Sequence, residues 1–222
     1  MTKSKPVTAL VAAAGQGNRL GAGIPKALVE VGGKTLLERS VDGLQAAGVD
    51  RIVVVISPPM VPQVQAILED RVEIVLGGAE RMDSVQQGLR HIGEGTVLIH
   101  DAARAFTPVD MIQRIIAASL EHKAVIPVLP VTDTVKRVRG EVVVETLERS
   151  ELRAVQTPQA FDIATLKAAY EARPVGSLAT DDASIMEWFG VTVHCVAGDV
   201  HALKVTTPLD LVLAKALAKG EQ

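Results

Sequence analysis

Four glycines and two cations gather near the start of the chain in a pattern that suits a bound polyphosphate. A short apolar run over residues 7–14 leads into a loop that holds Gly15, Gly17, Gly21, Gly23, Arg19 and Lys26. Glycines allow successive backbone N–H groups to face an anion, and the two cations supply the positive charge that phosphates attract. An ordinary loop with solvated surface charges is the competing interpretation, because short glycine motifs often occur by chance.

Two familiar phosphate-binding loops fit this stretch poorly. A dinucleotide-binding loop needs a third small residue three places after Gly17, but that position is Leu20, and Pro25 interrupts the stretch soon afterwards. A Walker loop fails too, because no Gly-Lys-Ser/Thr follows these glycines at the required spacing.

Further candidate groups lie where predicted strands end. Residues 77–84, Gly-Gly-Ala-Glu-Arg-Met-Asp-Ser, follow one such strand, and Gly78 and Ser84 suit contact with the edge of a flat base. The alternative is a plain loop in which Asp83 or Ser84 caps the next helix. Asp101 ends another strand, where a carboxylate needs donors or a cation, so it is a candidate for ribose or Mg²⁺ contact.

Two late segments complete this set. Residues 180–184, Thr-Asp-Asp-Ala-Ser, are typical of a helix N-terminus, which binds phosphate as readily as it caps itself. Lys204 stands between Leu203 and Val205 at the end of a predicted late strand. A lysine between two apolar residues at a strand end more often points into a binding site. A solvated lysine is the simpler alternative.

Apolar runs alternate with helical patterns along most of the chain. Short apolar runs predict strands over 7–14, 51–57, 72–76, 96–100 and 124–129. Helical spacing predicts helices over about 37–48, 61–69, 81–92, 109–121, 162–172, 181–188 and 208–218. This alternation predicts an α/β fold with a doubly wound, mostly parallel sheet. Ligands then bind at the carboxyl ends of its strands.

One region departs from that rhythm. Residues 136–139 and 142–145 flank a Gly140-Glu141 turn and predict a hairpin within an arm over residues 131–150. A two-stranded ribbon is marginal alone in water, so it must pack against something. We expect an arm that embraces a second subunit, and an edge hairpin of the main sheet is the alternative.

Composition bounds the class of protein. Of the 222 residues, 48% are hydrophobic and 22% are charged, as in a globular protein, and we expect a single domain over residues 1–222 with the arm as its subdomain. The net charge of −3 does not indicate the basic surface that nucleic-acid binding requires. No apolar run approaches the length that spans a membrane.

Two smaller features bear on compartment and redox chemistry. Lys3, Lys5 and Ala12-Ala13-Ala14 imitate a signal peptide, but cleavage there would remove a predicted strand, so we expect a cytoplasmic protein. Cys195 is the one cysteine and lies in an apolar run, which predicts a buried, inert thiol.

The motifs taken together resemble a known family. Residues 13–19 with Pro25-Lys26 are similar to A-A-G-x-G-x-R and P-K, the signature of sugar and polyol phosphate nucleotidyltransferases. The chain resembles the 2-C-methyl-D-erythritol 4-phosphate cytidylyltransferases in five further segments: Val-Leu-Ile-His-Asp-Ala-Ala-Arg at 97–104, Pro-Val-Thr-Asp-Thr-Val-Lys-Arg at 130–137, Gln-Thr-Pro-Gln-Ala-Phe at 156–161, Thr-Asp-Asp-Ala-Ser at 180–184 and Leu-Lys-Val-Thr-Thr-Pro at 203–208.

This resemblance implies a Rossmann-like nucleotidyltransferase fold and a Mg²⁺-dependent enzyme. The enzyme would transfer CMP from CTP to 2-C-methyl-D-erythritol 4-phosphate in non-mevalonate isoprenoid synthesis. The implied catalytic residues are Arg19, Lys26, Lys204 and Asp101, with Asp101 also near the metal and the ribose. The implied nucleotide contacts are Ala13, Ala14, Gly15, Gly17, Gly78 and Ser84. The implied acceptor contacts are Arg104, Thr134, Arg149 and Thr180, of which Thr134 and Arg149 would reach across a homodimer interface.

A few positions depart from the family pattern. Ala12 and Ala105 stand where the family usually has Pro, and Ala202 replaces a polar residue, which leaves the metal shell less defined. A ribitol 5-phosphate cytidylyltransferase has overlapping motifs and is the first alternative. A non-catalytic nucleotide-binding regulator of the same fold is the second, but a passive binder has no need of all four catalytic residues.

Overall fold

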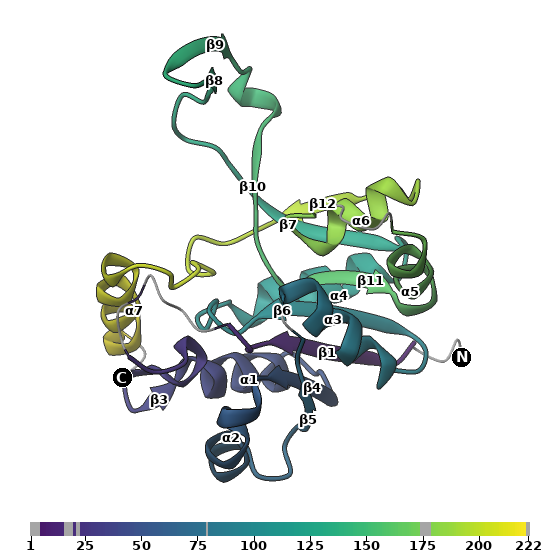
Figure 1. Cartoon of the computed structure of the whole chain (residues 1–222), viewed down its shortest axis with the longest axis vertical. Coiled ribbons are helices and arrows are strands. Elements are labelled where there is room, and N and C mark those ends of the chain that lie inside the picture. Colours follow the sequence, from purple (N-terminus) through teal and green to yellow (C-terminus); the bar gives the residue numbers. More distant parts are fainter. Residues whose placement is uncertain (1–4, 16–19, 21–22, 79, 174–178, 221–222) are drawn as a thin grey trace.

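The computed structural model describes residues 5–15, 20, 23–78, 80–173 and 179–220. Within these residues, one sheet of eight strands has the order β10-β7-β11-β6-β1-β4-β5, and β12 pairs with β7 (Figure 1). Its strands are β1 (Val7–Ala12), β4 (Arg51–Ile56), β5 (Glu73–Leu76), β6 (Thr96–Asp101), β7 (Ala124–Pro130), β10 (Arg153–Val155), β11 (Gln159–Asp162) and β12 (His194–Ala197). The predicted mostly parallel α/β sheet is confirmed.

Strand β1 lies inside the sheet, between two parallel neighbours. Ala9 pairs with Ile52 of β4 on one side and with Leu98 of β6 on the other. A strand that is covered on both faces reads as a continuous apolar run, which is why residues 7–14 show no alternation. The run that imitates a signal peptide therefore forms an interior strand of the sheet.

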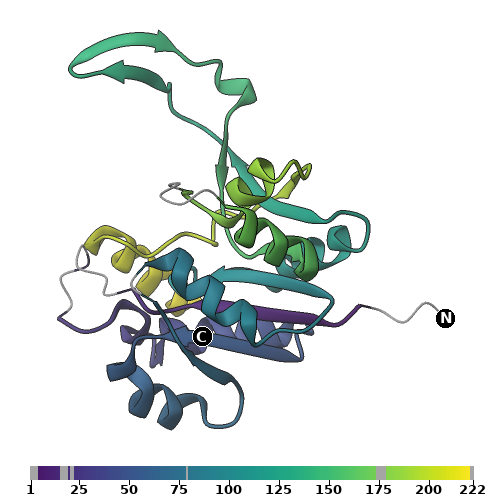
Figure 2. The same ribbon diagram turned by 45° about the vertical axis from the view of Figure 1, so that its right-hand side comes forward.

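Helices cover both faces of the sheet, as the views in Figures 1 and 2 show. Successive residues of β1 point to opposite faces: Ala9 and Val11 belong to one core cluster, and Leu10 belongs to the other. The first cluster takes residues from α1 (Leu36–Ala46), α2 (Val61–Leu68) and α4 (Val109–Ser119). The second takes residues from α3 (Arg81–Arg90), α5 (Ile163–Ala172) and α6 (Asp182–Trp188). The doubly wound arrangement follows from this division.

Smaller elements close the edge of the sheet at which β1 and β6 end. The hairpin of β2 (Glu30–Val31) and β3 (Lys34–Thr35) packs against α7 (Pro208–Gly220). Short 3-10 helices occur at η2 (Lys26–Leu28), η3 (Pro58–Met60) and η4 (Arg149–Glu151). A third buried cluster joins α7 to this hairpin and to the start of α1. The carboxyl ends of the strands thus open toward segments that come from both halves of the chain.

Some elements differ from the sequence predictions. β10 and β11 were not predicted, and both pair antiparallel with β7. The segment with Lys204 was expected to end a strand, but residues 202–205 form no strand. Cys195 was expected to be buried, yet it is exposed, because β12 pairs only with β7 in the sheet and shows one face to solvent.

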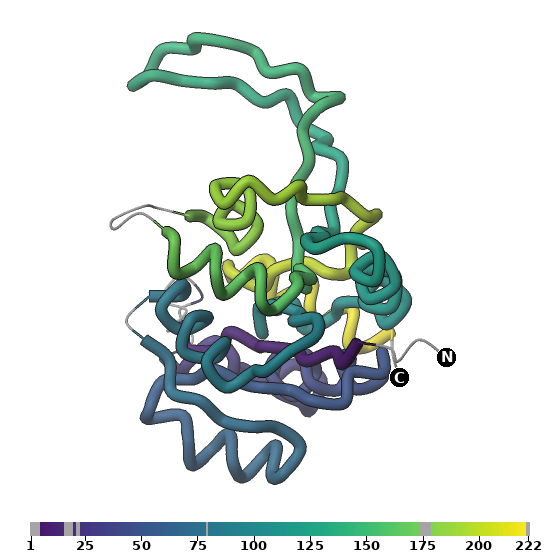
Figure 3. The backbone as a smooth tube through the Cα atoms, turned by 90° about the vertical axis from the view of Figure 1, so that its right-hand side faces the viewer, coloured from purple at the N-terminus to yellow at the C-terminus, as the bar shows by residue number. Residues whose placement is uncertain are grey.

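The predicted arm is present as a hairpin that projects from the body of the molecule. β8 (Lys136–Arg139) pairs antiparallel with β9 (Val142–Thr146), and Gly140 in the turn has a φ of +61°. Figures 1 and 3 show the hairpin standing well away from the main sheet. It forms a separate two-stranded sheet, so the alternative of an edge hairpin on the main sheet is wrong. None of the helices among the described residues is long and apolar enough to cross a bilayer.

Candidate active site

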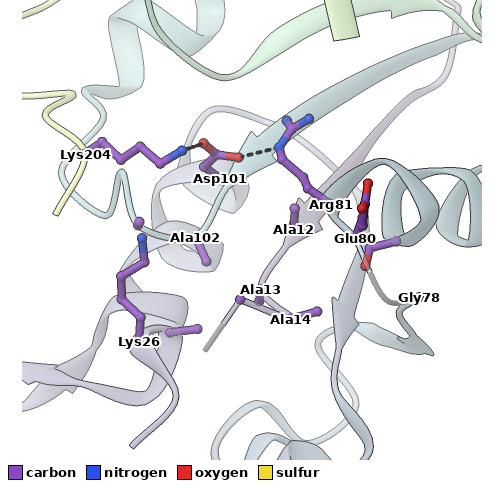
Figure 4. Close-up of a pocket in the computed structure, with 14 residues that line it drawn as sticks. Ala12, Ala13, Ala14, Lys26, Gly78, Glu80, Arg81, Asp101, Ala102 and Lys204 are labelled. Carbon is purple, nitrogen blue, oxygen red and sulfur yellow. Dashed lines mark hydrogen bonds and ion pairs between the residues drawn. The ribbon is translucent and has the colours of Figure 1, made fainter. Parts of the chain in front are cut away.

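A pocket opens where β1 and β6 end, and small residues form its floor (Figure 4). The backbone N–H of Ala13 donates to the carbonyl of Val55 (2.9 Å), and that of Ala102 donates to the carbonyl of Ala12 (3.3 Å). These bonds extend the sheet pairing just past the strand ends. The pocket is lined by Ala12, Ala13, Ala14, Gly15, Lys26, Ala27, Gly78, Glu80, Arg81, Ser84, Asp101, Ala102, Ala103 and Lys204. A floor with so few side-chain atoms lets a ligand approach the backbone closely.

The loop between β5 and α3 forms one wall. In the alternative interpretation of this loop Asp83 or Ser84 caps the helix, but Glu80 is the N-cap and exchanges hydrogen bonds with Asp83 in a capping box. Ser84 is therefore buried inside the first turn. A Cβ on Gly78 would collide with the side chain of Asp83. The glycine is thus required by the tight approach of the loop to its own helix.

Asp101 lies at the centre of the charged groups, between two cations. One carboxylate oxygen is 2.6 Å from the Nζ of Lys204, and the other is 3.2 Å from the Nε of Arg81. Burial acts to raise the pKa of Asp101, but the charges of Arg81 and Lys204 outweigh it and hold this pKa well below the usual range. Asp101 is therefore a carboxylate near pH 7.

Arg81 is a site residue that the sequence predictions missed. It is the first residue of α3, and its guanidinium reaches from Asp101 to Asp182, 2.8 Å from an oxygen of the latter. The Asp182 and Asp101 charges oppose the effect of burial and raise the pKa of Arg81 above its usual value. Arg81 stands in the residue run at 77–84, of which only Gly78 and Ser84 were expected to bind a ligand, and no local pattern indicates that Arg81 reaches Asp101 and Asp182.

Lys204 reaches Asp101 from a segment that other contacts hold in place. The N–H of Val205 donates to the carbonyl of Ala103 (2.9 Å), which anchors the segment to the loop after β6. Arg104 donates to the carbonyls of Ala202 (2.7 Å) and Val155 (3.2 Å). Arg104 thus ties three parts of the chain together behind the pocket.

His100 supports Asp101 from within the sheet. Its Nδ1 lies 3.2 Å from the hydroxyl of Thr157, and the same hydroxyl accepts from the backbone N–H of Asp101 (3.0 Å). Burial lowers the pKa of His100 to about 4, so the ring is neutral near pH 7. His100 does not line the pocket, so it supports the site from within the sheet.

The structure brings together most of the residues predicted to bind the nucleotide and its phosphates. Those that line the pocket are Ala13, Ala14, Gly15, Lys26, Gly78, Ser84, Asp101 and Lys204. Gly17 and Arg19 lie outside the described residues.

The predicted acceptor contacts lie elsewhere: Arg104, Thr134, Arg149 and Thr180 do not line the pocket. Thr134 and Arg149 are on the exposed arm, and the Arg149 guanidinium donates to the carbonyl of Thr132 (2.7 Å). Thr180 is exposed just before α6.

These features define a class of enzyme. A mostly parallel doubly wound sheet carries, at the carboxyl ends of its strands, a floor of small residues surrounded by Lys26, Arg81, Lys204 and Asp101. Strand ends of this kind are where α/β folds bind nucleotides, and the cations suit a polyphosphate. The fold and the site are those of a nucleotide-binding enzyme.

Comparison with known proteins gives the family. The family model for 2-C-methyl-D-erythritol 4-phosphate cytidylyltransferase matches residues 7–219. Proteins of that name from Corynebacterium diphtheriae and Rhodococcus jostii are 53% and 51% identical to this chain, each over 96% of it and over 94% and 96% of their own lengths. The chain therefore belongs to the 2-C-methyl-D-erythritol 4-phosphate cytidylyltransferase family and is an enzyme of that class.

Solved structures agree with this assignment. The 2-C-methyl-D-erythritol 4-phosphate cytidylyltransferase of Thermus thermophilus superposes with a TM-score of 0.81 at 36% identity, covering 96% of this chain and 99% of that one. The 4-diphosphocytidyl-2C-methyl-D-erythritol synthase of Anaerococcus prevotii gives a TM-score of 0.85 at 31% identity, covering 97% and 96%.

Proposed function

We propose that this pocket transfers CMP from CTP to 2-C-methyl-D-erythritol 4-phosphate, giving 4-diphosphocytidyl-2-C-methyl-D-erythritol and pyrophosphate. The observation that carries the proposal is the set of charges around Asp101, which lies beside a floor of small residues. The Nζ of Lys204 is 2.6 Å from one carboxylate oxygen of Asp101, and the Nε of Arg81 is 3.2 Å from the other. Family membership fixes the two substrates. The reaction consumes CTP, and we place it in the cytoplasm.

CTP lies along the floor in this proposal. Ala13, Ala14 and Gly15 offer backbone groups to the nucleotide, while Gly78 and Ser84 on the opposite wall meet the cytosine. Both groups line one pocket. In this proposal Lys26 faces the phosphates from the start of η2, and Gly17 and Arg19 contact the nucleotide as well.

Catalysis then rests on position and charge. The phosphate oxygen of the acceptor attacks the α-phosphorus of CTP in line, the bond from that phosphorus to the bridging oxygen breaks, and pyrophosphate leaves with the electron pair. A phosphate monoester is already anionic near neutral pH, so the attack requires no strong base. Lys26, Lys204 and Arg81 offset the negative charge where two anions meet, and the ion pairs with Asp101 hold Lys204 and Arg81 in place before the substrates arrive.

The residues present fit one Mg²⁺ ion that is bound chiefly by the nucleotide. The described residues contain no cluster of three or more His, Cys, Asp or Glu side chains able to hold a metal. Mg²⁺ typically takes one or two carboxylates together with substrate phosphates, and Asp101 supplies one carboxylate in the pocket. The ion would neutralise charge on the triphosphate.

The acceptor contacts are completed by a second subunit in this proposal. We assign Arg104 and Thr180 to the acceptor from the same chain on the family resemblance, although neither lines the pocket. Thr134 and Arg149 are on an arm that does not reach its own pocket, and the arm exposes Val138, Val142, Val143 and Val144. Such apolar surface on a lone ribbon favours burial against a partner, so the enzyme is a homodimer through residues 131–150.

The assay that tests this function measures pyrophosphate release from CTP and Mg²⁺ with three additions: methylerythritol phosphate, ribitol 5-phosphate and no acceptor. We expect release with methylerythritol phosphate, its cytidylylated product by mass spectrometry, and a rate at least about tenfold lower with ribitol 5-phosphate, because a site built for one hydroxyl pattern rejects another. Turnover with ribitol 5-phosphate alone, or no turnover with either acceptor, would overturn the assignment.

A further inference from the structure

A buried carboxylate outside the pocket fixes one of the cations inside it. Asp182, the first residue of α6, has no exposed surface. One of its oxygens is 2.8 Å from a terminal nitrogen of Arg81, and the other accepts from the hydroxyl of Tyr170 on α5 at 2.6 Å. A buried carboxylate is costly unless donors surround it, and here both oxygens are engaged.

Its neighbour Asp181 has a different part in the fold. Asp181 is the N-cap of α6: its carboxylate accepts from the backbone N–H of Ser184 at 3.0 Å and from Gln159 at 2.9 Å. The helix start is therefore satisfied without Asp182. Asp182, the second aspartate of the Thr-Asp-Asp run, is therefore available to bind Arg81.

The contacts form one chain of hydrogen bonds from the helix layer to the pocket. Tyr170 donates to Asp182, Asp182 accepts from Arg81, and Arg81 donates through Nε to Asp101. Asp101 also accepts from Lys204. With two of its three nitrogens bound to carboxylates, the guanidinium has its plane and position set from both sides.

The pocket contacts of Arg81 depend on this anchor. The remaining nitrogen, Nη1, is buried without a hydrogen-bond partner among the described residues, so without Asp182 nothing described holds the far side of the guanidinium. We propose that Asp182 and Tyr170 are positioning residues that hold Arg81 against Asp101 and so set the geometry of the transfer step. This inference rests on the proposed function of the pocket.

The test compares variants in steady-state CMP transfer. Asp182→Asn keeps an acceptor but loses the charge, and we expect kcat to fall at least about tenfold while the KM for CTP changes little, since the nucleotide floor is untouched. Tyr170→Phe removes a single hydroxyl and should lower kcat less. Asp181→Asn is the matched control, because Asn caps helices as well as Asp, and its kcat should stay near that of the wild type.

A double-mutant cycle separates positioning from general loss of stability. If Asp182 acts through Arg81, Asp182→Asn should have almost no further effect on kcat in an Arg81→Ala background. Additive losses in that background would overturn the inference. So would losses of kcat that follow the loss of thermal stability equally in the Asp181 and Asp182 variants.

A readout that needs no turnover keeps this inference distinct from the assigned reaction. In the wild type the Nε–H of Arg81 should give a protected NMR signal, identified by its absence in Arg81→Lys. The signal should exchange faster with water in Asp182→Asn and in Tyr170→Phe. If the wild type fails to transfer CMP, the proposed function is wrong and this signal alone decides the inference: an unchanged signal in both variants would overturn it.

Discussion

Asp101 joins two cations from distant parts of the chain, so its charge organises the pocket. Arg81 comes from the start of α3, and Lys204 comes from the segment after β12. An amide at this position would still accept a hydrogen bond, but the two cations would then repel each other without a charge between them. The fold around β6 has other support, because the strand pairs on both sides.

We therefore predict that Asp101→Asn loses activity and remains folded. Turnover should fall at least about a hundredfold, as when one preorganised charged group is removed, and the dependence on Mg²⁺ concentration should shift. Initial rates over a Mg²⁺ series, with circular dichroism as the control for folding, would measure both effects. An unfolded variant would mean that Asp101 is a structural partner and not a site residue.

His100 predicts how stability depends on pH. Its folded pKa is lowered to about 4, whereas an unfolded histidine has a pKa of about 6.5. Between these values the unfolded chain binds a proton that the folded chain does not, so stability falls as the pH drops from about 6.5 to about 4. Chemical denaturation at several pH values should show a slope of up to about 1.4 kcal/mol per pH unit from this group. The His100→Gln variant should have a shallower slope, and an equal slope would assign the effect to other groups.

At the residue scale, the sequence predicted several residues that meet in one pocket, but it missed contacts that only tertiary structure creates. Lys26, Asp101 and Lys204 were identified by motif and by strand ends, and they meet in one pocket. Arg81 and Asp182 were not identified, because their pairing joins positions 101 residues apart. No local pattern of residue types marks such a pair.

At the scale of elements, we propose that the loop between β5 and α3 controls which base fits. It is short, its Gly78 has no room for a side chain, and Ser84 is buried beside it. Backbone groups at fixed positions can match the donor and acceptor pattern of one base edge. We therefore expect a larger purine to fit only if the loop moves.

We predict a preference for CTP over UTP, ATP and GTP. Initial rates with the four nucleotides at equal concentration would measure it, and Gly78→Val should reduce turnover with CTP by shifting the loop. Equal turnover with CTP and ATP would contradict the placement of the base on this loop.

Elements were predicted well where hydrophobic periodicity marks them. β1, β4 and β6 are apolar runs buried on both faces, and α1 and α4 carry apolar residues at helical spacing. β10 and β11 have three and four residues, which is too short for periodicity to reveal. The segment of Lys204 looks like a strand because Leu203 and Val205 flank the lysine, but those side chains pack against α7 and the hairpin of β2 and β3 instead.

At the scale of the whole molecule, the arm bears on whether one chain alone can form a complete active site. Its hairpin stands apart from the main sheet (Figure 1) and exposes four valines: Val138, Val142, Val143 and Val144. A two-fold partner would bury them, and symmetry would make the exchange mutual. Arg149 at the base of the arm would then serve the pocket of the other subunit.

Mixed dimers test this arrangement. Arg149→Ala and Lys26→Ala should each be nearly inactive, with a loss of about a hundredfold. When the two proteins exchange subunits, one pocket receives both changes and the other receives neither, so activity should partly return. A dimer of Arg149→Ala with itself, taken through the same exchange, is the control. No recovery in verified mixed dimers would mean that Arg149 acts within its own chain.

The place of β1 in the sheet has a consequence for how the protein is made. β1 (Val7–Ala12) pairs with β4 and with β6, which begins only at Thr96. The ribosome releases the chain N-terminus first, so one edge of β1 stays unpaired until β6 has emerged, and pairings between distant segments form slowly. A nascent chain halted before Thr96 exposes an apolar strand edge that other chains or chaperones can bind. The strand that leads into the glycine loop, although among the first to be synthesised, is therefore completed late.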